Sequence, residues 1–240
     1  MKILILVAHP DDEIIMCGAT IDKLVKKGHQ IFVTYFTTND QAFFGNETQN
    51  KRRKRAINEA VISSKMLKYS TNFIKLQDMQ LEKDKGLLIQ QIIKEVRRVK
   101  PSAIITHNQH DKHIDHRTLA EIIPEANFQS GQKLCGGNTK WTANLILKGE
   151  VDLEMTAQFN FQVISIISEK NLKIKLRAFS CYQSVNDEHG KNKDWLINKI
   201  NLCARLRGET IECRFGEAFS IDNYVPLKIE GIKIMLEILS

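Results

Sequence analysis

Short apolar runs alternate with segments of helical periodicity along the first half of the chain. Residues 3–8, 31–36 and 102–106 are rich in apolar and β-branched side chains. Short runs of this kind are typical of buried strands. Between them, apolar residues recur at helical spacing in three segments, 14–27, 48–67 and 87–99. The pattern therefore predicts right-handed strand–helix–strand units with parallel strands.

Outside these segments, apolar and polar residues alternate less regularly. Their pattern predicts further strands at 72–76, 141–147 and 159–164, and further helices at 117–124, 169–182 and 194–207. Residues 215–240 are mixed, and no element is predicted there. Because no repeat, low-complexity tract or linker divides the chain, we expect one domain over residues 1–240. The predicted fold class is α/β, with a mainly parallel sheet flanked by helices.

Composition narrows the class of protein. The 240 residues are 42% hydrophobic and 26% charged, which excludes general disorder, and the net charge of +7 favours anionic partners only weakly. The five cysteines are scattered and form no CxxC pair, at positions 17, 135, 181, 203 and 213. This usage indicates a reducing compartment and argues against a thiolate zinc site. No apolar run has the length of a signal peptide or a membrane span, so we expect a cytoplasmic protein without a transmembrane segment.

Two predicted strands end directly in ionisable residues. The first runs into Ala8-His9-Pro10-Asp11-Asp12-Glu13, and the strand at 102–106 runs into His107, His110, Asp111, His113, Asp115 and His116. Pro10 prevents a helix from continuing through the first cluster, so its polar groups lie on a stiff loop. The carboxyl ends of parallel strands share one edge of a sheet, where doubly wound folds place their active sites. The two clusters can therefore meet.

The residue types in these clusters suit metal-assisted hydrolysis. His9 and Asp12 are three residues apart, and so are His113 and His116 near the start of a helix. Two imidazoles and a carboxylate around a divalent ion, with one position open to water, form a hydrolytic zinc site. Zinc lowers the pKa of its water to about 7, a nearby carboxylate such as Asp11 can take the proton, and a spare histidine can stabilise an oxyanion. Iron, manganese and cobalt accept similar ligands.

These motifs resemble the PIG-L or LmbE-like family of zinc-dependent N-acetylglucosaminyl deacetylases. The resemblance rests on residues 8–13, continued by 17–21, and on 106–108 with Asp111, His113 and 115–117. Weaker similarities occur at Ala178, Tyr182, Ser184 and 215–219, so the likeness spans nearly the whole chain. It implies a Rossmann-like fold that binds zinc at its carboxyl edge and hydrolyses the N-acetyl group of an amino sugar.

The resemblance also implies a role for each residue of the motifs. The implied metal ligands are His9, Asp12 and His116. Asp11 would be the general base, His113 the electrophilic or general-acid histidine that faces the tetrahedral intermediate, and Asp115 would orient an imidazole. Glu13 has no implied catalytic role, and we expect it to be structural, because an acidic residue suits the start of a helix.

An arginine of the family holds the sugar, often in an Arg-x-x-Glu pattern. Here Arg55 precedes Glu59 by four residues, so Arg55 is the first candidate and Arg52 and Arg53 are the alternatives. The basic run lacks interleaved aromatic residues, and no nucleic acid partner is expected. Part of it can instead meet a phosphate of a nucleotide-linked or lipid-linked amino sugar. The sequence leaves the oligomeric state open.

Three alternatives compete with this interpretation. The site can hydrolyse a different acyl-amide, because such a constellation selects a carbonyl and little else. The protein can also be a metal- and sugar-binding protein without turnover. Dinucleotide binding is disfavoured, because residues 9–12 place carboxylates where a glycine-rich phosphate loop would be needed.

Overall fold

Five parallel strands place both polar clusters at one edge of the sheet. The computed structural model describes residues 1–41, 47–133, 139–151, 158–184 and 194–240. β1 (Lys2–Val7) lies between β2 (Gln30–Tyr35) and β4 (Ala103–His107), and β3 (Ser70–Phe73) and β5 (Leu145–Gly149) extend the parallel sheet on either side. The predicted parallel arrangement is confirmed.

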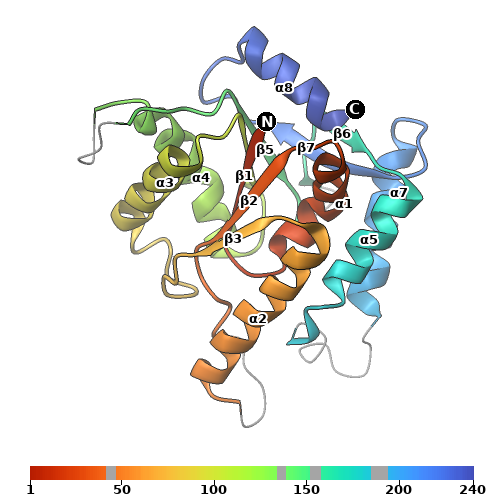
Figure 1. Cartoon of the computed structure of the whole chain (residues 1–240), viewed down its shortest axis with the longest axis horizontal. Helices are drawn as coiled ribbons and strands as arrows, with labels where there is room; N and C mark the ends of the chain where they lie inside the picture. Colours follow the sequence, from red (N-terminus) through yellow and green to blue (C-terminus); the bar gives the residue numbers. More distant parts are fainter. Residues whose placement is uncertain (42–46, 134–138, 152–157, 185–193) are drawn as a thin grey trace.

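Two antiparallel strands complete the sheet. β7 (Gly216–Ile221) pairs with β5, and β6 (Val163–Ile166) pairs with β7. Among the described residues the strand order is β3-β2-β1-β4-β5-β7-β6 (Figure 1).

Helices cover both faces of the sheet. The helices are α1 (Asp12–Lys26), α2 (Gln49–Leu67), α3 (Lys85–Val99), α4 (Ile114–Ser130), α5 (Glu169–Phe179), α7 (Trp195–Glu209) and α8 (Ile229–Leu239). Alternate residues of β1 point to opposite faces, so Ile5 belongs to one core cluster, with residues of α1, α2, α5, α7 and α8, whereas Leu6 belongs to a second, with residues of α3 and α4. The two groups of helices lie on opposite sides of the strands (Figure 1). The predicted α/β class is confirmed.

Some boundaries differ from the prediction. The helix expected to stop at Pro124 continues to Ser130, because Ile122, Ile123 and Ala126 are buried on the sheet and this burial offsets the hydrogen bond that a proline removes. The strand expected from 141 begins at Leu145.

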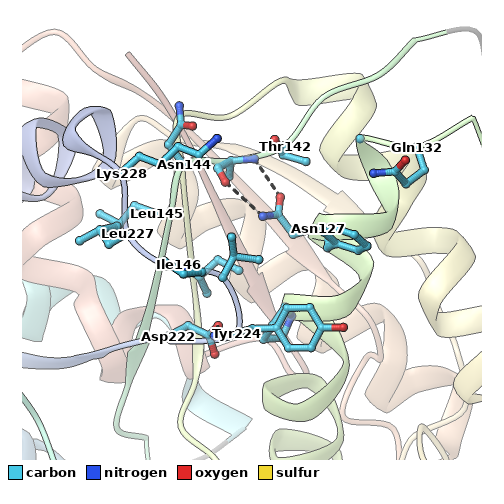
Figure 2. A pocket seen from close by; sticks show the side chains of 16 residues that line it. Asn127, Gln132, Thr142, Asn144, Leu145, Ile146, Asp222, Tyr224, Leu227 and Lys228 are labelled. Atoms are coloured by element: carbon cyan, nitrogen blue, oxygen red, sulfur yellow. Dashed lines mark hydrogen bonds between the residues drawn. The ribbon is translucent and has the colours of Figure 1, made fainter.

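A side-chain amide explains this later start. The Asn127 side chain accepts a hydrogen bond from the Ala143 N–H (2.8 Å) and donates one to the Ala143 carbonyl oxygen (3.1 Å), as Figure 2 shows. The backbone groups of Ala143 are therefore bound by a side chain and not by a neighbouring strand.

The similarity at residues 215–219 has a structural explanation. Helix α1 leaves helical geometry at Cys17 (φ −146°, ψ 24°). Beyond this kink, the buried Glu217 carboxylate accepts hydrogen bonds from the Ala19 and Thr20 N–H groups at 3.1 and 2.7 Å, and Lys175 lies 2.7 Å from it. Glu217 of β7 thus caps the second part of α1, a role that depends on contacts between distant parts of the chain.

None of the helices formed by the described residues combines the length and the apolar character that a membrane crossing requires.

Candidate metal centre

The first polar cluster is shaped by a sharp turn between β1 and α1. Asp11 has φ 114° and ψ −29°, and its carbonyl oxygen accepts the N–H groups of Ile14 and Ile15 at 3.0 and 3.1 Å, which starts the helix. The Asp12 carboxylate accepts a hydrogen bond of 2.7 Å from the His9 N–H. The turn therefore brings the Asp12 side chain back over His9.

The second cluster is shaped by the loop between β4 and α4. The Asp111 carboxylate accepts the His113 N–H at 2.8 Å, and Nδ1 of His113 accepts the Asp115 N–H at 3.2 Å, which caps α4. Because β1 and β4 are paired neighbours, with Ile5 beside Ile105, the two loops lie at the same edge of the sheet. The expectation that the clusters meet is confirmed.

Donor atoms of three side chains from the two clusters converge. His9 Nδ1 lies 3.1 Å from His116 Nε2 and 3.3 Å from an Asp12 oxygen, and His116 Nε2 lies 3.3 Å from the other Asp12 oxygen. All three side chains are buried. Tetrahedral zinc with bonds of about 2.0–2.1 Å separates its ligands by about 3.3 Å. The two imidazole nitrogens and the carboxylate therefore fit a small divalent ion.

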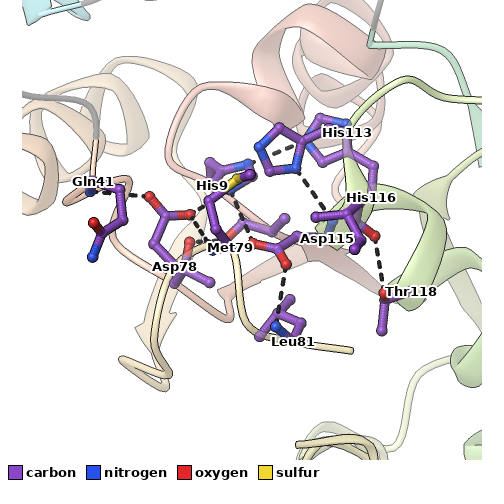
Figure 3. A network of polar contacts seen from close by, with 12 residues as sticks. His9, Gln41, Asp78, Met79, Leu81, His113, Asp115, His116 and Thr118 are labelled. Atoms are coloured by element: carbon purple, nitrogen blue, oxygen red, sulfur yellow. Dashed lines mark hydrogen bonds and ion pairs between the residues drawn. The ribbon is translucent and has the colours of Figure 1, made fainter. Parts of the chain in front are cut away.

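A carboxylate lies behind each of the two imidazoles. His9 Nε2 contacts Asp78 at 3.0 Å and lies 3.6 Å from Asp115, and His116 Nδ1 contacts Asp111 at 3.0 Å; Figure 3 shows the His9 side of this network. A proton held on the far nitrogen leaves the near nitrogen with a lone pair that faces the site. This is how protein carboxylates orient metal-binding histidines.

Asp115 is completely buried and binds backbone N–H groups. Its carboxylate accepts the N–H groups of Met79 and Leu81 at 2.8 and 3.2 Å (Figure 3). Asp115 thus fixes the segment that carries Asp78, and Asp78 is the nearer carboxylate to His9.

Charges in the site favour a cation. Burial lowers the pKa of His116, but the Asp12 and Asp111 carboxylates outweigh it and raise this pKa to about 9. Burial also lowers the pKa of His9, yet hydrogen bonds to nearby carboxylates, Asp115 first, raise it well above its ordinary value. Burial raises the pKa of Asp12, and the neighbouring imidazoles, His116 foremost, bring it well below its ordinary value.

His107 offers a second set of donors with Asp12 and His116. However, His107 Nε2 accepts a hydrogen bond of 3.0 Å from the Ala8 N–H, and its ring stacks on that of His116 with centroids 4.0 Å apart and planes 7° apart. Burial and the charge of His116 lower the pKa of His107 to about 3. Because its Nε2 lone pair already accepts the Ala8 N–H, the stacked His107 supports His116 better than it binds an ion.

His113 is more exposed than His9, His107 and His116. It is half-buried, and its ring centroid lies 4.5 Å from that of His9 and 4.7 Å from that of His116. Burial and the charges of these two neighbours lower the pKa of His113 to about 4. Since Nδ1 accepts a backbone N–H, the neutral ring carries its proton on Nε2.

Asp11 is buried but contributes no donor atom to the groups of potential ligands found among the described residues. Its N–H donates to the Glu13 carboxylate at 3.2 Å. The structure therefore places Asp11 next to Asp12 in the chain and outside the set of converging donors.

The three candidate arginines have different surroundings. Arg55 donates to Glu59 at 3.1 Å, and the buried Arg52 donates to the Asn39 carbonyl oxygen at 3.1 Å. Arg53 pairs with Asp40 through two guanidinium nitrogens and keeps 40% of its side chain exposed. The neighbouring Gln41 N–H donates to Asp78 at 3.2 Å. The segment 39–41 therefore links Arg52 and Arg53 to the network behind His9.

Sequence reasoning missed Asp78 and the support that His107 gives to His116. Asp78 carries a weak signal, because it follows the strand predicted at 72–76 and so lies at the same edge of the sheet as the motifs. Asp111 belonged to the recognised motif without a role, and the structure places it against His116.

A pocket of about 330 Å³ lies at the opposite edge of the parallel strands, between the start of β5, the end of α4 and residues 222–228 (Figure 2). None of the clustered histidines lines this pocket. This pocket is therefore separate from the converging donors.

If Asp78 holds His9 in place for a metal, Asp78→Asn is expected to lower zinc affinity by about 10–100-fold, because it removes the negative charge that orients the His9 imidazole. Competition against a chromophoric chelator measures this affinity. The matched control is Asp84→Asn, which changes an exposed carboxylate nearby. Equal affinities in the two variants would contradict a role for Asp78.

Three solved structures are similar over nearly the whole chain. An N,N'-diacetylchitobiose deacetylase from Pyrococcus horikoshii is 20% identical with a TM-score of 0.78, and the match covers 95% of this chain and 86% of that one. GalB, the 4-carboxy-2-hydroxymuconate hydratase from Pseudomonas putida, is 18% identical with a TM-score of 0.79, covering 92% and 95%. A teicoplanin deacetylase in its zinc-inhibited form is 11% identical with a TM-score of 0.70, covering 93% and 99%. At these identities the likenesses show a shared fold.

A family model that matches the sequence is more specific than the shared fold. The model of the PIG-L family, described as GlcNAc-PI de-N-acetylase, matches residues 4–127, which is more than half of the chain and includes both polar clusters. The family expected from the motifs is therefore confirmed: the chain belongs to the PIG-L family.

Proposed function

We propose that the protein is a metal-dependent hydrolase that removes the N-acetyl group from an N-acetylglucosamine-type sugar or sugar conjugate. The observation that carries this proposal is the convergence of His9 Nδ1, His116 Nε2 and the Asp12 carboxylate within 3.1–3.3 Å of one another. The name of the family, GlcNAc-PI de-N-acetylase, and the name of the similar diacetylchitobiose deacetylase support deacetylation of an amino sugar. The name of the similar teicoplanin deacetylase supports deacetylation.

In this proposal His9, Asp12 and His116 hold the ion, and zinc is the first candidate. When bound, such an ion supplies Lewis acidity, which polarises an amide carbonyl and lowers the pKa of water. Iron, manganese and cobalt suit the same donors. The carboxylates of Asp78 and Asp111 keep the far imidazole nitrogens protonated, so the near nitrogens stay available as ligands.

The remaining residues handle protons and charge. Asp11 takes a proton from the attacking water, because its carboxylate is adjacent to the ligand Asp12 without being one of the converging donors. His113 donates from Nε2 to the oxygen of the substrate carbonyl as negative charge develops there. Asp115 orients the site through the segment that carries Asp78. Arg55, Arg52 and Arg53 remain the candidates for sugar contacts.

Removal of metal tests this proposal. Acetate release from a panel of N-acetylated amino sugars is expected to fall to background after dialysis against a chelator, and to return when zinc or cobalt is added. Release that is indifferent to the chelator would contradict metal dependence. Release of other acyl groups, with acetate retained, would favour the alternative amidase. A metal-loaded protein that is inert on every amide would favour the non-catalytic alternative, and the hydratase among the similar structures shows that the fold does not select one reaction.

The substrate can carry a phosphate, as in a nucleotide-linked or lipid-linked sugar, and Arg53 is the arginine of choice for testing this. Arg53→Glu is expected to raise KM roughly tenfold for a phosphorylated N-acetyl sugar and to leave KM for the free sugar unchanged, because a charge-assisted contact is lost. Lys54→Glu makes the same change of charge at an exposed neighbour and serves as the control. Equal KM values for both substrates in the Arg53 variant would refute the phosphate contact.

A further inference from the structure

Glu13 is the one acidic residue of the first motif that the proposed chemistry does not use. The sequence predicts a structural role for it, as a negative charge at a helix start. In the structure its side chain is completely buried. Its Oε1 accepts hydrogen bonds from the hydroxyl groups of Tyr182 and Tyr69 at 2.6 and 2.7 Å, and its Oε2 accepts the Asp11 N–H at 3.2 Å.

This burial is not needed to start the helix. An exposed carboxylate in the first turn would interact favourably with the helix dipole, and Asp12 is already an acidic residue in that turn. Taking a carboxylate out of water is costly, and burial raises the pKa of Glu13 accordingly. The two tyrosines come from distant elements, Tyr69 beside β3 and Tyr182 beyond α5. Two distant parts of the fold thus hold one carboxylate of the turn in place.

What this carboxylate holds is a strained turn. Asp11 has φ 114°, a region that residues with a side chain rarely adopt, and such a conformation persists only where the surroundings enforce it. On its carboxyl side, the Asp11 carbonyl oxygen is tied into α1 by two hydrogen bonds. On its amino side, the Asp11 N–H is tied to Glu13. The rotation about the bond between N and Cα, which sets the direction of the Asp11 side chain, is therefore fixed from both ends.

We propose that Glu13 is a positioning residue, which holds Asp11 in its left-handed conformation and so aims the Asp11 carboxylate at the attacking water. The inference rests on the proposed role of Asp11 as the base. Glu13 touches neither the converging metal donors nor, in this proposal, the substrate. Loss of the hydrogen bond between the Asp11 N–H and Glu13 lets residue 11 relax toward negative φ. This relaxation moves the Asp11 carboxylate away from the attacking water, while His9, Asp12 and His116 stay in place.

Glu13→Gln tests this directly, because its single amide oxygen cannot accept from the tyrosines and from the Asp11 N–H together. We expect kcat for acetate release to fall by about 10- to 100-fold, with KM and zinc content unchanged. In the Asp11→Asn background the same change is expected to cause no further fall. An equal fall in both backgrounds, or a loss of zinc, would show a merely structural role and overturn the proposal.

The matched control is Glu217→Gln, which alters another buried carboxylate that binds N–H groups of α1 but lies at the distant kink. It is expected to keep kcat, and a fall as large as that of Glu13→Gln would contradict the proposal. Should Glu13→Gln fail to fold, Tyr182→Phe removes one donor to Glu13 and is expected to lower kcat with zinc retained, again only when Asp11 is present.

A crystal structure of Glu13→Gln separates this inference from the proposed function. Residue 11 is expected to leave the positive-φ region, a result that needs no turnover. A residue 11 that keeps its conformation would overturn the positioning role even if the protein is a deacetylase. If the wild-type protein releases acetate from no substrate, the proposed function fails, and the relaxation of residue 11 still decides whether Glu13 holds the turn.

Discussion

Asp11→Asn is expected to lower kcat for acetate release by about 10²–10⁴-fold while the protein keeps its zinc. Asparagine has nearly the shape of aspartate and tolerates left-handed backbone, so the turn at φ 114° and the hydrogen bond from its N–H to Glu13 can persist. What the substitution removes is the ability to accept a proton. Steady-state kinetics together with elemental analysis of the same preparation measure both properties.

The control for Asp11→Asn is Asp84→Asn, which removes a carboxylate from an exposed position away from the motifs. Full activity in the Asp11 variant would eliminate Asp11 as the base. A loss of zinc together with activity would instead make Asp11 part of the metal centre, which the arrangement of donor atoms does not suggest.

His116→Ala is expected to abolish both zinc binding and acetate release. His116 Nε2 faces His9 and Asp12 at 3.1 and 3.3 Å, so its removal takes one of the converging donors from the site. Two neighbouring histidines of the described part of the chain are each engaged through one ring nitrogen. His107 is bound to the Ala8 N–H, and His113 caps α4. Zinc content after gel filtration is the direct readout.

His110→Ala is the matched control, because His110 belongs to the same histidine-rich segment but is exposed. It is expected to retain zinc and activity. If instead the His116 variant kept its zinc, the ion would have to be held by another set of donors, of which His9, Asp78 and Asp115 form the remaining candidate among the described residues.

The position of the site could be predicted because it depends on strand order alone. Two apolar runs that end in ionisable residues place these residues at one edge wherever the strands are parallel, and β1 and β4 prove to be neighbours. The family resemblance then distinguished His116 from His113, which spacing could not do. In the structure His113 Nδ1 accepts a hydrogen bond in the helix cap and His116 Nε2 faces the converging donors, and the assignment of His116 as the ligand stays a prediction.

The supporting residues could not be predicted, because their roles arise from contacts between distant segments. Asp78 reaches His9 from beyond β3, and only its place after a predicted strand distinguishes it from an ordinary loop aspartate. The buried state of Glu13 depends on Tyr69 and Tyr182, which lie 56 and 169 residues away.

The pattern of residues 215–240 predicted no element there, for a related reason. β7 carries Glu217 and Ser220 within a short strand, so its local pattern is not that of a buried strand. Its place is determined by pairing with β5 and β6 and by the contact of Glu217 with α1. Tertiary contacts of this kind override local preference.

The proposed hydrolysis requires that His9, Asp12 and His116 form one metal site. A crystal structure of the zinc-loaded protein, with an anomalous difference map at the zinc absorption edge, tests this requirement. We predict a single strong peak within about 2.0–2.2 Å of His9 Nδ1, an Asp12 oxygen and His116 Nε2. A peak ligated by His107, a peak between His9 Nε2, Asp78 and Asp115, or the absence of a peak from a fully folded protein would contradict the account.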